Sequence, residues 1–169
     1  MIPAFRDAGT GDAEALAALG RRSFSETFGH LYTADNLAAF LATHSIEAWA
    51  RELDHPDFAI RIGEVAGEAM AYAKLGPPTL PFEPRGKAVE LRQFYVLSEW
   101  HGCGAASEMM RWVLDVARRR GGEDLYLSVF IDNQRARAFY TRYGFVEEGR
   151  YAFMVGTHAD EDVVMRLAL

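Results

Sequence analysis

The residues from His101 to Ser107, HGCGAAS, have the composition of an anion-binding turn. Gly102 and Gly104 allow the backbone to turn tightly and to expose its N–H groups. A helix that begins near Gly104 would add its own unpaired N–H donors and the positive end of its dipole. We therefore predict that the backbone of this turn binds a phosphate or pyrophosphate group.

The segments on either side of the turn have the patterns of a strand and a helix. The β-prone residues before the turn are Val89, Leu91, Phe94, Val96 and Leu97. After the turn, apolar residues recur at helical spacing: Ala106, Met109, Met110, Val113, Leu114 and Ala117. Three arginines (118–120) suit the C-terminal end of a helix, and the glycine pair 121–122 would end it. Because purely structural turns have the same order of elements, the motif needs further support.

The rest of the chain alternates between helical and extended patterns. Helices are predicted after the cap residues Thr10 and Thr33 and over 46–53 and 135–143. Further strands are predicted over 5–8, 58–65, 69–75, 125–130, 146–154 and 163–167. Residues 76–86 contain four prolines and are predicted to be an irregular loop. These elements predict a mixed α/β domain with helices on both sides of one sheet.

The composition predicts a single soluble domain. The chain has 169 residues, half of them hydrophobic, which is enough for one core and too few for two domains to be expected. It has no membrane-spanning apolar run, and its N-terminal segment lacks the pattern of a signal peptide, so we expect a cytoplasmic protein that does not bind membranes. Cys103 is the single cysteine and the histidines lack ligand spacing, so we expect no disulfide and no metal. The net charge of −6 argues against nucleic acid and favours a cationic substrate.

A second motif follows in residues 130–145, FIDNQRARAFYTRYGF. Together with HGCGAAS, it resembles the Gcn5-related N-acetyltransferase (GNAT) superfamily, whose members carry the pattern N-x-x-A-x-x-F-Y-x-x-x-G-F at the end of a core strand. The matching residues are Asn133, Ala136, Phe139, Tyr140, Gly144 and Phe145. In the glycine turn the family has Gln or Arg, two residues, Gly, one residue, then Gly or Ala, and the corresponding residues are His101, Gly104 and Ala106. A neutral histidine offers one N–H but lacks the permanent charge of arginine.

The resemblance covers the whole chain and implies a fold and a reaction. The implied α/β fold is a GNAT-like mixed, mostly antiparallel central sheet with helices on both faces, splayed between the fourth and fifth strands. Residues 1–169 would form a single N-acetyltransferase domain that uses acetyl-CoA as cosubstrate and a small-molecule amine as acceptor. A homodimer is compatible with this resemblance.

The N-terminal and C-terminal segments resemble a bacterial branch that includes spermidine/polyamine acetyltransferases. The segments are RRSFSETFGHLYTADNLAAFL and GRYAFMVGTHADEDVVM. Relatives that acetylate polyamines tend to carry acidic residues just before the strand centre, where this chain has Arg92 and Gln93. The acceptor therefore stays open between a polyamine and another small amine.

The resemblance also implies roles for individual residues. The thioester carbonyl would lie near the backbone of Phe94, Tyr95 and Val96, with the Val96 N–H as the oxyanion donor. Asn133 would bind the pantetheine arm, and Tyr140 would protonate the departing thiolate. The pyrophosphate would lie on the turn formed by His101, Gly102, Cys103, Gly104, Ala105, Ala106 and Ser107.

The chemistry of amine acetylation requires an acid and a base. A phenol with a pKa of about 10 stays protonated and can give its proton to a thiolate as the charge develops, which suits Tyr140. The alternative for Tyr140 is simple packing against Phe139. An alkyl amine is neutral in only about one molecule in 2,500 at pH 7, a cost of roughly 4.6 kcal/mol, so a base is needed. Glu90 is the candidate base, and the alternative is that it is only a surface or strand-pairing carboxylate. A less favoured alternative mechanism passes through an acetyl group bound covalently to Cys103.

Two other classes of protein stay open. Gly102 and Gly104 begin a G-x-G-x-x-G pattern, and Asp132 ends the next strand as the ribose-binding acid of an NAD-dependent oxidoreductase would. Ser107 at the third glycine position opposes that class. The second alternative is a GNAT-like module that binds CoA without catalysis, against which the intact Asn133 and Tyr140 argue.

Overall fold

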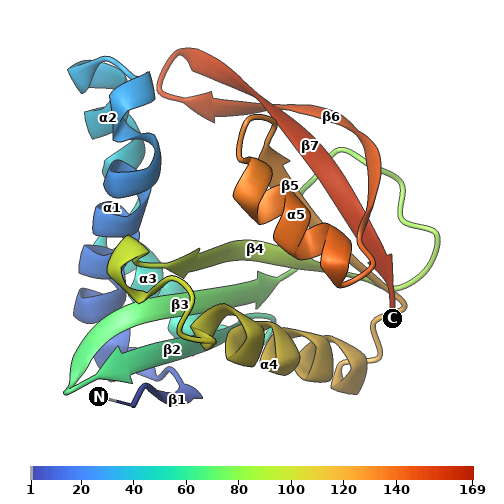
Figure 1. Ribbon diagram of the computed structural model, residues 1–169, viewed down its shortest axis with the longest axis horizontal. Helices are drawn as coiled ribbons and strands as arrows, with labels where there is room; N and C mark the ends of the chain where they lie inside the picture. Colours follow the sequence, from blue (N-terminus) through green and yellow to red (C-terminus); the bar gives the residue numbers. More distant parts are fainter. Residues whose placement is uncertain (1) are drawn as a thin grey trace.

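Seven strands form one sheet in the order β1-β2-β3-β4-β5-β7-β6 in the computed structural model, which describes residues 2–169 (Figure 1). Only Met1 of the expected domain lies outside the described residues. The strands are β1 (Ala4–Asp7), β2 (Ala59–Val65), β3 (Glu68–Gly76), β4 (Ala88–Val96), β5 (Asp124–Phe130), β6 (Val146–Val155) and β7 (His158–Ala168). The pair β4 and β5 is parallel, and the other neighbouring strands are antiparallel. This confirms the expected mixed sheet and differs from the parallel, doubly wound sheet of a dinucleotide-binding oxidoreductase.

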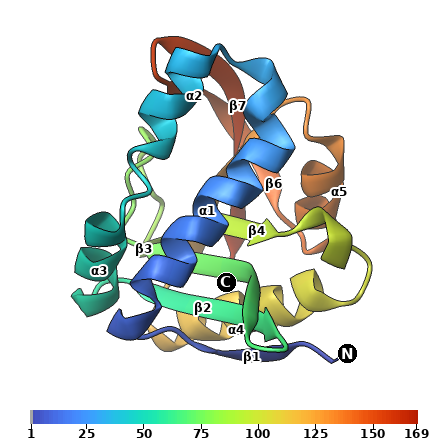
Figure 2. The same ribbon diagram turned by 90° about the vertical axis from the view of Figure 1, so that its left-hand side faces the viewer.

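Helices cover both faces of this sheet. They are α1 (Ala13–Phe28), α2 (Ala34–Leu41), α3 (Ile46–Asp54), α4 (Ala105–Arg119) and α5 (Gln134–Arg142), with short 3-10 turns at η1 (Thr10–Asp12), η2 (Gly29–Leu31) and η3 (Ser98–Trp100). Helix α1 crosses in front of the sheet in Figure 2, and α4 lies behind it. The side-chain oxygens of Thr33, Ser45 and Asn133 accept backbone N–H groups and fix where α2, α3 and α5 begin. Within residues 2–169, no helix has the length and apolar character needed to cross a membrane.

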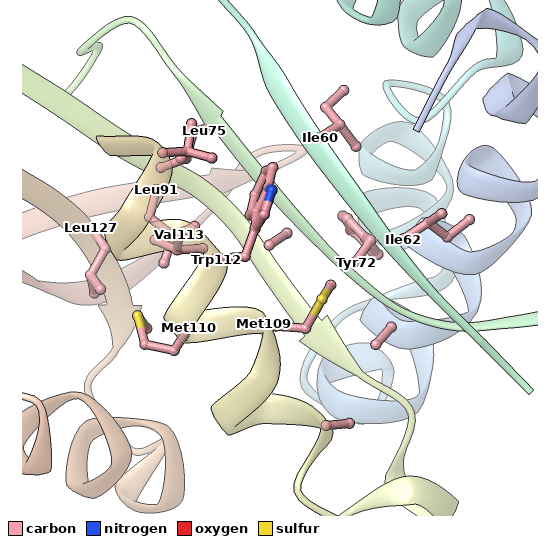
Figure 3. Close-up of a cluster of buried hydrophobic side chains, with 14 of the residues drawn as sticks. Ile60, Ile62, Tyr72, Leu75, Leu91, Met109, Met110, Trp112, Val113 and Leu127 are labelled. Carbon is pink, nitrogen blue, oxygen red and sulfur yellow. The ribbon is translucent and has the colours of Figure 1, made fainter. Parts of the chain in front are cut away.

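The core fills both faces of the sheet, and one half of it lies between α4 and the strands. Met109, Met110 and Val113 on α4 are fully buried, as their helical spacing predicts. In Figure 3 they lie beside Leu75, Leu91 and Leu127 of the sheet, whereas Ile60, Ile62 and Tyr72 point to the opposite face, toward α1 and α3. This packing holds the beginning of α4 in place, and with it the glycine turn.

Strands β4 and β5 are paired only where they begin. The parallel register joins Ala88–Glu90 to Asp124–Tyr126, and β5 is paired with β7 over its whole length. On the other side of β4, Lys74 pairs with Gln93 whereas Leu75 pairs with Leu91, so Arg92 is an extra residue in a β-bulge. A bulge bends its strand and increases the local twist. The two strands therefore part after Glu90, which confirms the expected splay.

The final hairpin is longer than the sequence pattern predicted. Strand β7 begins at His158 rather than at Val163, because Asp160 pairs with Phe153 on β6, and Asp162 pairs with both Phe130 on β5 and Tyr151 on β6. This pairing overrides the low β-propensity of acidic residues. At the tip of the hairpin, Asn36 Oδ1 accepts the Thr157 N–H at 3.0 Å, so the tip is attached to α2 (Figure 1).

Two methionines test the contribution of the core to stability. Met110 is 0% exposed on α4, whereas Met154 on β6 is 51% exposed. Met110→Ala should lower the free energy of unfolding by about 2–5 kcal/mol through lost burial and the cavity left behind. Met154→Ala should change it by less than about 0.5 kcal/mol. Equilibrium denaturation with urea measures both, and equal effects would contradict the placement of α4 on the sheet.

Candidate active site

A cavity of about 700 Å³ opens where β4 and β5 part. Its walls come from α1, α2, β4, β5, β7, the glycine turn and α5. Beyond Glu90, no described strand pairs with the edge of β4 that faces β5, so this edge offers unpaired backbone groups to a ligand. The cavity therefore combines an extended backbone edge, a glycine turn and buried side chains in one space.

The glycine turn has the backbone conformation that the sequence predicted. Gly102 has a φ of 81° and Gly104 a φ of 90°, both in the left-handed region that favours glycine, and Gly104 is the N-cap of α4. Five of the seven predicted residues of the turn line the cavity: His101, Gly102, Gly104, Ala106 and Ser107. Cys103 and Ala105 do not line it. The Cys103 thiol donates to the Trp100 carbonyl at 3.0 Å.

Both ring nitrogens of His101 contact other protein groups. Arg135, which has only donors, donates to Nδ1, so the proton of the neutral ring is on Nε2, which donates to the Val96 carbonyl at 2.8 Å. Arg135 also lines the cavity. It therefore brings to the turn the permanent positive charge that His101 lacks. Sequence analysis missed this role because Arg135 belongs to the second motif, at a position without a fixed residue type.

The end of β4 presents different side chains to its two faces. The ring of Phe94 lies 5.8 Å from that of Phe139 on α5, whereas Tyr95 stacks on Tyr72 at 5.5 Å. All three residues expected near the thioester carbonyl, Phe94, Tyr95 and Val96, line the cavity. The structure thus brings the predicted β4 residues and the glycine turn to the same cavity.

Tyr140 and Asn133 come to this cavity from α5. Tyr140 is 7% exposed, and burial, followed by the neighbouring Tyr95 phenol, raises its pKa well above the usual value. The phenol therefore stays protonated at physiological pH. Asn133 lines the cavity while its side-chain oxygen accepts the Ala136 N–H at 3.2 Å, which leaves its side-chain NH2 group for another partner.

Glu90 lies outside the residues that line the cavity. Its carboxylate accepts the backbone N–H of Thr79 at 2.6 Å and the Thr79 hydroxyl at 2.9 Å. Burial raises the pKa of Glu90, and these hydrogen bonds lower it. The carboxylate thus fastens the loop after β3 to β4, and the structure does not place it with Tyr140.

Two buried acids that sequence analysis missed line the cavity instead. Asp160 and Asp162 lie on β7, and Asp160 accepts a hydrogen bond from Tyr32. The pKa of Asp162 is raised to about 6, because burial and the nearby Asp160 carboxylate raise it more than the hydrogen bond from the Ser128 hydroxyl lowers it. Their i, i+2 spacing places both on one face of a strand, but the strand predicted from the sequence began only at Val163. No group of three or more His, Cys, Asp or Glu side chains that could hold a metal occurs in residues 2–169.

Comparison with known proteins agrees with this geometry. The model of the acetyltransferase (GNAT) family matches residues 15–145. An uncharacterised N-acetyltransferase of Mycobacterium tuberculosis is 34% identical over 155 residues, which cover 91% of this chain and 96% of that protein. A similar uncharacterised N-acetyltransferase of Lactobacillus delbrueckii subsp. lactis is 24% identical, with 94% and 92% of the two chains covered.

Solved structures show the same fold. The PaiA N-acetyltransferase of Thermoplasma acidophilum, crystallised with coenzyme A, superposes with a TM-score of 0.81 over 100% of both chains at 17% identity. The ribosomal-protein-S18-alanine N-acetyltransferase of Escherichia coli gives a TM-score of 0.70 at 18% identity and covers 99% of this chain and 94% of that one. The chain therefore belongs to the GNAT acetyltransferase family and is an acyl-CoA-dependent N-acetyltransferase.

Two glycines with left-handed φ test the anion-binding turn. Gly104 and Gly67, which has a φ of 85° in the β2–β3 turn, both have open space where a Cβ would lie. Alanine at either position should cost about 1–2 kcal/mol of backbone strain. Only Gly104→Ala should also weaken acetyl-CoA binding, by about tenfold or about 1.4 kcal/mol, because it reorients the amides of the turn. Isothermal titration calorimetry measures this, and equal dissociation constants for the two variants would remove the turn from the cosubstrate site.

Proposed function

We propose that the protein transfers the acetyl group of acetyl-CoA to a small primary amine by direct attack in a ternary complex, with Tyr140 as the general acid. The observation that carries this proposal is the buried phenol of Tyr140 in the cavity that also contains the free edge of β4 and the glycine turn. A phenol that stays protonated can donate to sulfur only as the thiolate charge develops. The Asp162 carboxylate lines the same cavity and replaces Glu90 as the candidate base.

The cosubstrate would lie along one half of the cavity. The amides of the glycine turn and the Arg135 guanidinium would bind the pyrophosphate, because both offer donors to an anion. The pantetheine arm would follow the free edge of β4 and reach the side-chain NH2 of Asn133. The Val96 N–H would stabilise the oxyanion that forms on the thioester carbonyl.

The proposed reaction conserves every proton. An ammonium acceptor first loses one proton to a base, and the neutral nitrogen then attacks the thioester carbonyl carbon to form the C–N bond. The C–S bond breaks as Tyr140 gives its proton to sulfur. The nitrogen returns its second proton to Tyr140, and the products are the N-acetyl amide and free CoA. The base releases its proton to solvent.

The acceptor is the open part of this proposal. The E. coli protein of the same fold acts on a ribosomal-protein alanine according to its name, and a shared fold does not fix the acceptor. We keep a polyamine or another small amine as the acceptor on the basis of the sequence resemblance. The buried acids of the cavity support a cationic acceptor.

Two tyrosines of the same α5 segment test the general acid. Tyr140→Phe should lower kcat by about 100-fold, because the thiolate then leaves without a proton, while the acetyl-CoA dissociation constant stays unchanged. Tyr143→Phe is the matched control, since Tyr143 packs against Phe139 at 5.0 Å and does not line the cavity. Its kcat should stay within about twofold of the native value.

The assay measures release of the free CoA thiol from acetyl-CoA with a library of primary amines. Thiol release that requires an amine separates an enzyme from a module that only binds CoA. Full kcat in Tyr140→Phe would overturn the assignment of Tyr140.

A further inference from the structure

The half of the cavity away from the glycine turn is built from aromatic rings. We call it the acceptor pocket and define it by α1, Tyr32, α2, Gln93, Tyr95, Phe130 and the β6–β7 hairpin. Its rings contact one another across four elements. Phe24 and Phe40 lie 4.1 Å apart, Phe28 and Phe130 6.0 Å, and Phe40 and Phe153 5.6 Å. Such a wall binds apolar groups of ring size and stacks on them.

Of the two acids in this pocket, Asp162 is the one whose carboxylate is available to a ligand. Asp160 accepts from Tyr32 with one oxygen, and its other oxygen lies 3.2 Å from His158 Nε2. Asp162, which is 5% exposed, has the Ser128 hydroxyl and Tyr95 as its neighbours and lines the cavity. A buried carboxylate in an aromatic pocket favours a cation over a neutral ligand.

The side chain of Gln93, whose amide oxygen is unpaired, lies on the same face of β4 as Tyr95. Gln93 is directly opposite Lys74, and Tyr95 is opposite Tyr72, so both β4 side chains point to the α1 and α3 side of the sheet. The Gln93 Oε1 atom is buried and has no hydrogen-bond partner within residues 2–169. Gln93 also lines the cavity. A buried acceptor without a donor is costly, so a ligand N–H group would stabilise it.

From these contacts we infer that the acceptor is a monocationic primary amine with an aromatic group, an arylalkylamine, whose ammonium lies between Asp162 and Gln93 and whose ring packs in the aromatic wall. This inference rests on the proposed function and specifies its acceptor. Asp160 is already contacted by Tyr32 and His158, so Asp162 is the one acid among the residues that line the cavity that is left to pair with an ammonium group. One available carboxylate favours a single positive charge over the several charges of a polyamine.

Asp162 is then the proton acceptor for the bound ammonium. Its carboxylate is ionised above a pKa of about 6 and protonated below it. The groups that face it are Asp160, Tyr95, Tyr32 and Ser128, of which Asp160 is the other acid. The ammonium gives one proton to Asp162, and the neutral nitrogen attacks the thioester as described above. The charged carboxylate both binds the cation and accepts the proton. As the pH decreases, kcat/KM should therefore fall more steeply below about pH 6 than above it.

The first experiment compares three amines in the CoA-thiol assay: 2-phenylethylamine, butylamine and spermidine. We expect kcat/KM for 2-phenylethylamine to exceed that for butylamine and for spermidine by at least about tenfold, because only its ring fills the aromatic wall. A kcat/KM for spermidine or butylamine equal to or above that for 2-phenylethylamine overturns the inference and leaves the proposed function intact. Absence of thiol release with every amine of the library, while acetyl-CoA still binds, overturns both.

The second experiment uses variants with the same three amines. Asp162→Asn should lower kcat/KM for 2-phenylethylamine by about 100-fold and remove the break near pH 6, with the acetyl-CoA dissociation constant unchanged. Asp115→Asn is the control, because Asp115 pairs with Arg119 on the outer face of α4 and its side chain is 62% exposed. It should retain native rates and the same pH profile.

A third variant tests the aromatic wall. Phe40→Leu should reduce the preference for 2-phenylethylamine over butylamine by at least about fivefold, since the ring contacts are lost. An unchanged preference contradicts the wall as the ring site. An unchanged pH profile in Asp162→Asn with normal acetyl-CoA binding contradicts Asp162 as the proton acceptor.

Discussion

The limited pairing of β4 with β5 is the constraint on which the rest of the site depends. Three residues of parallel register hold the two strands together, and the extra residue Arg92 bends β4 away from its neighbour. If the pairing continued, β5 would satisfy the edge of β4 and fill the space of the cavity. Because the pairing stops, the end of β4 presents its backbone to a ligand. Strand β5 pairs with β7, so the acids of β7 lie on the opposite wall of the cavity.

The cavity has opposite charges at its two ends. Arg135 and the amides of the glycine turn lie at one end, and Asp160 and Asp162 on β7 lie at the other. An anionic cosubstrate and a cationic acceptor would each be drawn to a different end, so their reacting groups would meet near Tyr140. The order along the cavity follows from the fold, since the turn comes shortly after β4 in the chain, whereas β7 lies beyond β5 in the sheet.

Much of the fold could be predicted from the sequence, because helical spacing, strand propensity and glycine positions are local signals. The stripe of Met109, Met110 and Val113 predicted the buried face of α4 in this way. The site was harder to predict because it depends on contacts between distant segments. The side-chain direction of Glu90 depends on Thr79 in a proline-rich loop. The strand that contains Asp162 forms only because two partners pair with it, against the propensity of its acids.

The attachment of the hairpin tip to α2 has a consequence for how such enzymes change their substrates. Asn36 on α2 bonds Thr157 between β6 and β7, so the acceptor pocket is assembled from an early and a late segment of the chain. The family model ends at residue 145, before the hairpin begins. The segments that mark the chain as an acetyltransferase and the segment that carries Asp162 can therefore diverge separately. A change of acceptor would then require changes in the hairpin and could leave the glycine turn, the proposed site of the cosubstrate, unaltered.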